Sequence, residues 1–147
     1  FKGEVPDGEH VEQIGKAKVL RQGRDCTIVA LALMVHRALE AAEILEKEHG
    51  ISCTVVDVRS LVPLDTLTIL AEVAKTGRLV TIEENPRLCG WGAEIASIVA
   101  DEIFWDLDGP IIRITTPHLP LPSADFLEDN TIPSVERVVR EIREKID

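Results

Sequence analysis

The stretch TIVALALMVHRALEAAEILEKEHGISCTVVDV, residues 27–58, decides the fold. It opens and closes on short apolar runs, at 27–33 and 52–58. Both runs are rich in aliphatic and β-branched residues and neither alternates strictly with polar ones. Such runs are typical of strands that are buried on both faces of a parallel sheet.

The segment between these two runs has helical periodicity. Its apolar face is formed by Val35, Ala38, Leu39, Ala42 and Leu45. Gly50 follows where a helix C-terminal cap belongs. The stretch therefore predicts a strand, a helix and a second, parallel strand, joined by a right-handed crossover.

The same alternation continues along the chain. Apolar runs recur at 78–84 and 110–116, a second helix is predicted between Asp65 as its N-cap and Gly77 as its C-cap, and a third begins after Gly92. The last helix carries the clearest apolar stripe, which consists of Val135, Val138, Val139, Ile142 and Ile146. Alternating strands and helices predict an α/β fold, a three-layer α/β/α sandwich.

One predicted strand differs from the others. Residues 17–22 lead into the 27–33 strand through only Gly-Arg-Asp. A loop that short permits a hairpin and no crossover, so we expect an antiparallel edge strand. The fold class predicted is thus a mixed five-stranded sheet with four parallel strands and one antiparallel edge strand. Residues 1–16 are expected to form an arm or linker, 17–147 one domain, and 116–133, with four prolines, an ordered surface loop.

Composition narrows the classes of function. The chain has 147 residues, 45% of them apolar and 29% charged, as expected of one soluble domain. Its net charge of -10 disfavours binding to nucleic acid or anionic lipid, and its apolar runs are too short to span a membrane. Three cysteines without Cys-x-x-Cys spacing predict a reduced, cytoplasmic chain rather than a disulfide framework or a zinc site.

The stretch EENPRLCGWGAEI, residues 83–95, looks most like chemistry. Gly90 and Gly92 could open a phosphate-binding helix N-terminus. The third glycine of a dinucleotide fingerprint is missing, however, and two glutamates beside the turn would repel a phosphate. Close packing of the helix on the strand is the favoured interpretation, with phosphate binding left as the alternative.

The other reactive side chains of this stretch have two interpretations each. Glu83 and Glu84 end a predicted strand at the edge where α/β sheets bind ligands, yet neighbours on a strand point to opposite faces. We expect a solvated or interface edge rather than an acid/base pair. Cys89 lies near a helix start, where a thiol can be activated, but no histidine is near it in sequence, so packing is favoured. Local chemistry predicts no catalytic, cofactor-binding or metal-binding residue.

Six segments together resemble a known family. They are GKAKVLRQGRDCTIVA, MVHRALEAAEIL, VVDVRSLVPLD, KTGRLVTIEENP, GWGAEI and LEDNTIPSVERVV. In this order and spacing they are similar to the C-terminal end of the β subunit of thiamine-diphosphate-dependent 2-oxo acid dehydrogenase E1 enzymes. The resemblance covers nearly the whole chain and implies the transketolase C-terminal fold, with five strands of which one is antiparallel.

This resemblance implies a role in assembly. In the family, thiamine diphosphate and Mg²⁺ bind to other domains, so this segment is expected to bind neither cofactor. The resemblance implies that it packs against the E1 α subunit and a second β subunit, and that it docks the basic subunit-binding domain of the E2 acyltransferase. On the resemblance, Asp108 and Asp147 correspond to the contacts for that domain's arginines, with a turn role for Asp108 as the alternative.

The family's chemistry leaves the substrate open. Pyruvate, branched-chain 2-oxo acids and acetoin all remain possible, because the resemblance places the substrate pocket elsewhere. Two other hypotheses are a C-terminal fragment of a deoxyxylulose-phosphate synthase or transketolase, and a free-standing ligand-binding α/β module whose pocket lies at 83–92.

Overall fold

A computed structural model describes residues 7–146 of the chain, and its centre is a five-stranded sheet. The strands are β1 (Lys18–Arg21), β2 (Cys26–Ala30), β3 (Cys53–Asp57), β4 (Leu79–Pro86) and β5 (Ile112–Thr116). Their order is β1-β3-β2-β4-β5. β1 runs antiparallel to β3 at one edge, and the other three pairs are parallel. The predicted mixed sheet with one antiparallel edge strand is confirmed.

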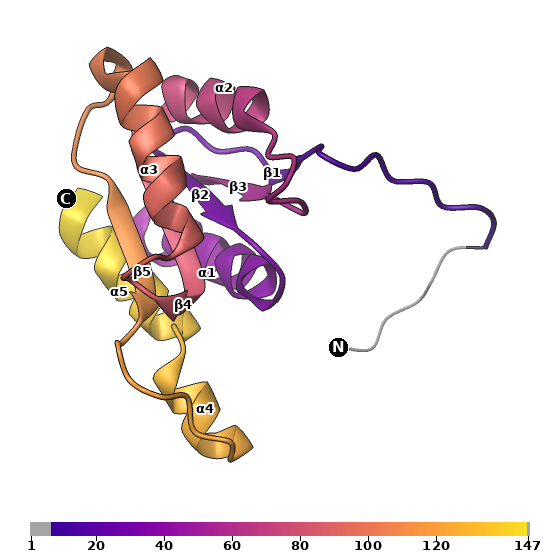
Figure 1. Ribbon diagram of the computed structural model, residues 1–147. Helices are drawn as coiled ribbons and strands as arrows, with labels where there is room; N and C mark the ends of the chain where they lie inside the picture. The colour runs from indigo at the N-terminus through magenta and orange to yellow at the C-terminus, as the bar shows by residue number, and fades with distance from the viewer. Residues whose placement is uncertain (1–6, 147) are drawn as a thin grey trace.

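Helices cover both faces of this sheet (Figure 1). They are α1 (Leu33–His49), α2 (Thr66–Thr76), α3 (Trp91–Glu102), α4 (Asp125–Thr131) and α5 (Val135–Ile146), with a short 3-10 helix, η1 (Phe104–Asp106). α1 and α5 pack on one face, and α2 and α3 pack on the other. The predicted three-layer sandwich is confirmed.

The helix ends lie where turn chemistry predicts them. Gly50 and Gly77 end α1 and α2 in the left-handed conformation, with φ of 70° and 65°, which glycine adopts without the strain of a Cβ. Asp65 caps α2 by accepting the Thr68 N–H at 3.3 Å. α3 begins at Trp91, slightly before the predicted start, because Gly90 already takes the extended N-cap conformation.

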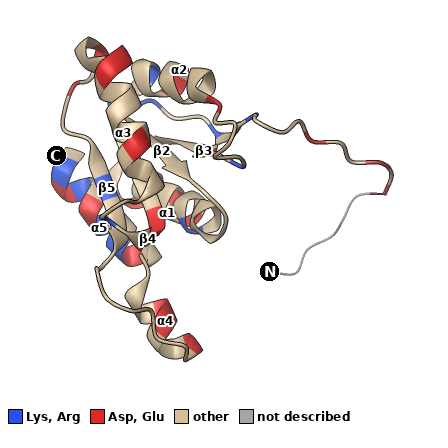
Figure 2. Ribbon diagram, viewed as in Figure 1, with Lys and Arg blue, Asp and Glu red and all other residues tan. Residues whose placement is uncertain are grey.

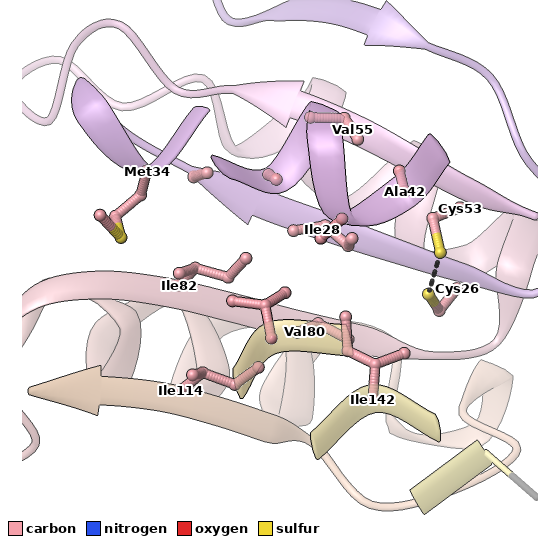
Figure 3. Packing of buried hydrophobic residues seen from close by; sticks show 14 of the residues in the cluster. Cys26, Ile28, Met34, Ala42, Cys53, Val55, Val80, Ile82, Ile114 and Ile142 are labelled. Atoms are coloured by element: carbon pink, nitrogen blue, oxygen red, sulfur yellow. Dashed lines mark hydrogen bonds between the residues drawn. The ribbon is translucent and has the colours of Figure 1, made fainter. Parts of the chain in front are cut away.

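The core has one apolar cluster on each side of the sheet. On the α1/α5 side, strand residues such as Ile28, Ile82 and Ile114 pack against Ile142 of α5 (Figure 3). Alternate strand residues, such as Val29, Val56 and Leu79, face the other way. They pack on α2 and α3, where Ile95 and Val99 of α3 belong to the same cluster. Every residue of β2 is buried, as expected of a central parallel strand.

Two buried thiols meet in the first cluster. Cys26 and Cys53 are register partners on β2 and β3, with their sulfurs 3.4 Å apart (Figure 3). The hydrogen bond to Cys53 and burial together raise the pKa of Cys26 well above its ordinary value. Both cysteines are free thiols, and at this pKa Cys26 packs as a neutral, apolar side chain.

The edge strand β1 pairs with β3 and not with β2, to which a four-residue loop connects it, so the hairpin expected from this short loop is wrong. The loop crosses over the start of β3, where Gly23 donates its N–H to Thr54 Oγ1 at 2.9 Å and Asp25 donates to the Ser52 carbonyl at 2.9 Å. A Cβ at Gly23 would lie 2.3 Å from the Cys53 carbonyl carbon. The missing side chain of Gly23 is therefore what allows so short a loop to step over a strand.

The proline-rich segment 116–133, expected to be an ordered surface loop, contains the helix α4. The prolines lie on either side of residues 123–132, so nothing prevents a helical turn within them. Thr131 Oγ1 donates to the Leu127 carbonyl at 2.7 Å and closes the helix end. None of the side chains of α4 is buried, which explains why it has no apolar stripe to reveal it.

The described residues at the N-terminal end, ahead of β1, extend away from the body (Figure 1). Residues 7–13 are exposed, and Glu12 forms an ion pair with Arg59 at 2.7 Å. The boundary predicted at residue 16 stays a prediction, and residues 1–6 lie outside the described part. None of the described helices combines the length and apolarity that a membrane crossing requires.

Candidate functional site

The stretch 83–95, whose residue types suggested a reactive site, is built around a buried carboxylate. Glu83 lies on β4 and has no solvent exposure. Its carboxylate accepts hydrogen bonds from the Gly92 N–H at 2.9 Å, from Asn85 Nδ2 at 3.0 Å and from Arg113 of β5 at 3.0 Å. Arg113 faces the same side of the sheet because its register partner is Thr81, two residues before Glu83. The charge of Glu83 is thus neutralised within the chain.

Two glycines give this carboxylate its place at the start of α3. A Cβ at Gly92 would lie 2.4 Å from Glu83 Oε1, and one at Gly90 would lie 2.3 Å from Glu83 Oε2. Any side chain at either position would displace the carboxylate. The positive end of the helix dipole therefore meets the chain's own anion, and the N–H group that a phosphate would need is already bonded.

The expectation of a solvated or interface edge is wrong for Glu83. The carboxylate is buried because the two glycines leave room for it and Arg113 supplies the opposite charge. Glu84 points to the other face, as expected, and is only partly buried. Burial raises the pKa of the Glu84 carboxyl, and the positive charge of Arg37 on α1 offsets only part of this rise. The two glutamates do not form an acid/base pair.

Cys89, the third candidate of this stretch, is an exposed thiol. It sits in the turn between β4 and α3 with a φ of 58°, a conformation that is uncommon for a residue with a side chain. The structure places it beside the glycine turn rather than in the core, so the packing role expected for it is wrong.

Asp108, one of the two predicted docking residues, follows η1 and is exposed. Its N–H donates to the Gly77 carbonyl at 2.8 Å. Its side chain lies against Gly77, since a Cβ there would be 2.3 Å from Asp108 Oδ2. The backbone of Asp108 is therefore tied to the end of α2 while its carboxylate remains accessible.

The second predicted docking residue, Asp147, lies outside the described residues. Its neighbour Ile146, the last residue of α5, lines an open hollow of about 410 Å³ together with Asp108. Arg78 also lines this hollow and donates to the Ile146 carbonyl at 3.3 Å. Segments that are 38 residues apart in sequence thus meet at one polar surface, which we call the Asp108 hollow.

Sequence reasoning missed several features of this region. Arg24 and Arg78 contribute positive charge to the Asp108 hollow, and nothing in the local sequence brings them to it. Phe104 and Trp105 are 55% and 92% exposed on η1. The exposure of these two aromatic residues could have been predicted, because they directly follow the apolar stripe of α3 and lie between acidic residues.

The described residues offer little to a metal or a diphosphate cofactor. No group of three or more His, Cys, Asp or Glu side chains that could hold a metal ion occurs within residues 7–146. At the N-terminus of α3, where a phosphate could bind, the Gly92 N–H already donates to the Glu83 carboxylate. The residues present at that turn therefore do not fit a bound diphosphate.

Known proteins similar to this chain agree on its family. The family model described as "Transketolase, C-terminal domain" matches residues 15–138. The pyruvate dehydrogenase E1 component subunit beta-2, mitochondrial, of Oryza sativa is 50% identical over 95% of this chain and 37% of its own length. The acetoin:2,6-dichlorophenolindophenol oxidoreductase subunit beta of Bacillus subtilis is 46% identical over 95% of this chain and 40% of its own.

A solved structure gives the same result in three dimensions. A split-gene transketolase, described as an inactive beta4 tetramer, superposes with a TM-score of 0.80 at 30% identity, over 98% of this chain and 45% of that one. The chain thus spans about two fifths of the length of the relatives that it matches. Because the family model matches residues 15–138, the chain belongs to the transketolase C-terminal domain family.

Proposed function

We propose that this chain is the C-terminal assembly domain of the E1 β subunit of a 2-oxo acid dehydrogenase. It joins the E1 α subunit and a second β subunit, and it docks the subunit-binding domain of the E2 acyltransferase. The full enzyme uses thiamine diphosphate and Mg²⁺ to decarboxylate a 2-oxo acid and to pass the acyl group to lipoyl. This domain binds neither cofactor and works in the reduced cytoplasm.

One observation carries the docking part of this proposal. Asp108 and Ile146, the last described residue of α5, line the same open hollow, which supports a docking surface formed by segments that are distant in sequence. The net charge of -10 favours such a partner, because complementary charge speeds and orients association. Individual exposed pairs contribute only about 0.2 to 1 kcal/mol, so docking needs several of them together.

The assembly part is supported by apolar side chains that this chain leaves in water. Val62 and Leu67, near the start of α2, are 92% and 75% exposed. Large apolar side chains at these levels of exposure mark surfaces that partner proteins cover. The names of the relatives, which are β subunits, fit a domain that works within a larger assembly.

The cofactor claim is tested on the 147-residue chain by calorimetry with thiamine diphosphate and Mg²⁺. We expect no heat of binding, because Glu83 already occupies the N-terminus of α3, where a diphosphate would bind. Micromolar binding would show that the cofactor residues have been assigned to the wrong domains. A binding-competent full E1 enzyme, titrated in the same way, is the positive control.

The docking claim is tested on the assembled E1 enzyme with the cognate subunit-binding domain. We expect a complex that weakens as salt is raised, since exposed ion pairs are screened. An assembled, active enzyme that does not bind the domain would refute docking. An enzyme that turns over a ketose phosphate and not a 2-oxo acid would instead favour the transketolase hypothesis, which the split-gene transketolase structure supports.

A further inference from the structure

An aromatic pair protrudes from the end of α3. The rings of Phe104 and Trp105 are 5.1 Å apart between centroids, at 83° to each other, in an edge-to-face arrangement. Trp105 is 92% exposed and Phe104 is 55% exposed. A tryptophan leaves a large apolar area in water at this level of exposure, and tryptophan is the residue most enriched where partner proteins bind.

The backbone holds this pair in a defined position. The residues on either side, Ile103 and Leu107, are partly buried and pack against the α2/α3 side of the core. Between them, the Asp106 N–H donates to the Ile103 carbonyl at 3.0 Å and the Leu107 N–H donates to the Phe104 carbonyl at 3.2 Å. The rings are thus presented by a short turn anchored at both ends, which limits the ordering entropy that binding would cost.

The charge around the pair is entirely acidic along the chain. No lysine or arginine occurs between Arg87 and Arg113. The exposed acids on either side of the rings are Asp101, Glu102, Asp106 and Asp108. Figure 2 shows acidic residues at this end of α3. An indole face with carboxylates beside it favours a cation, and above all an arginine guanidinium, which stacks on the ring while it pairs with the acid.

We infer that Phe104 and Trp105 form an aromatic anchor for the basic E2 subunit-binding domain, beside the Asp108 hollow. This inference rests on the proposed docking function and adds to it. Asp108 lies three residues after Trp105, so one arginine-bearing segment can contact both. The carboxylates steer and orient the partner, and the anchor supplies the short-range contact that exposed ion pairs alone lack.

The test measures the dissociation constant of the assembled E1 enzyme for the cognate subunit-binding domain, with four forms of the β chain. These are the wild type, Trp105→Ala, Trp105→Phe and Phe126→Ala. Phe126 is the matched control, because it is an exposed aromatic residue on α4, at the opposite end of the molecule in Figure 1. We expect Trp105→Ala to weaken binding at least about tenfold, Trp105→Phe to keep most of the affinity, and Phe126→Ala to bind as the wild type.

The outcomes separate this inference from the proposed function. Wild-type binding with unchanged affinity in Trp105→Ala overturns the anchor and leaves docking intact. Absence of binding by the active wild-type enzyme overturns docking itself. If Trp105→Ala instead dissociates the β subunits from each other, as seen by light scattering, the pair contacts a second copy and the anchor is refuted. Circular dichroism of Trp105→Ala should match the wild type, because the removed ring is exposed.

Discussion

Replacing Gly92 with alanine should destabilise the chain, although alanine is the better helix former. Within an ordinary helix this change stabilises by about 1 kcal/mol. Here the new Cβ would lie 2.4 Å from Glu83 Oε1, about 1.0 Å closer than the 3.4 Å at which ordinary contact begins. It would also lie 2.6 Å from Thr81 Oγ1, so the methyl group collides on two sides.

The cost follows from what the carboxylate must give up. A shift of that size stretches the bonds from Gly92 and Arg113, now 2.9 and 3.0 Å, beyond hydrogen-bond range. Hydrogen bonds to charged groups contribute about 1.5 to 3 kcal/mol, and overpacking costs about 1 to 3 kcal/mol. After the gain in helix propensity, we expect the free energy of unfolding to fall by about 2 to 4 kcal/mol.

Equilibrium urea unfolding, followed by circular dichroism, measures this loss. Gly109→Ala is the matched control, because a Cβ at Gly109 meets no atom within 4 Å. Gly92→Ala should shift the unfolding midpoint to lower urea while Gly109→Ala leaves it nearly unchanged. A Gly92→Ala protein as stable as the wild type, or more stable, would refute the placement of Glu83 at the start of α3.

Two further predictions concern buried carboxylates. Arg113→Met should cost about 3 kcal/mol of unfolding free energy, because it leaves the buried Glu83 without its opposite charge. The loss should be smaller in a Glu83→Gln background. Equal losses in the two backgrounds of this double-mutant cycle would contradict the pairing. Asp65→Ala should cost about 1 to 2 kcal/mol at neutral pH through loss of the α2 cap. Burial alone would raise the pKa of Asp65, but hydrogen bonds from Thr68 and Ala17 and the nearby Lys16 lower it. The stability that Asp65 contributes is therefore full above its unfolded pKa of about 4, and it is lost as the pH falls through the lower folded value. The unfolding free energies of the wild type and of Asp65→Ala should thus converge in acid and not in alkali.

Most of the sheet could be predicted because its strands are buried on both faces. Such strands appear as apolar runs, and capping residues such as Asp65 and Gly77 punctuate the helices between them. The pairing of β1 could not be predicted, since it depends on how closely Gly23 passes the start of β3. α4 could not be predicted for a different reason. A helix that buries no side chain has no apolar stripe in its sequence.

The candidate site was predictable only in part. The glycines of the 83–95 stretch indicated close packing, and they proved to accommodate a carboxylate. The burial of Glu83 depends on Arg113, which is 30 residues away and reaches it through strand register. The Asp108 hollow likewise joins segments that are distant in sequence. Such sites follow from topology, which local patterns do not contain.

The most direct test of docking is the affinity of the assembled enzyme for the subunit-binding domain after removal of the two predicted contacts. Asp108→Ala combined with deletion of Asp147 removes carboxylates that contribute about 0.2 to 1 kcal/mol each as exposed pairs. We therefore expect binding to weaken up to about 30-fold at low salt, with a flatter salt dependence. Glu40→Ala, an exposed acidic residue of α1, controls for net charge and should bind as the wild type. Unchanged affinity in the doubly altered enzyme would contradict docking at the Asp108 hollow.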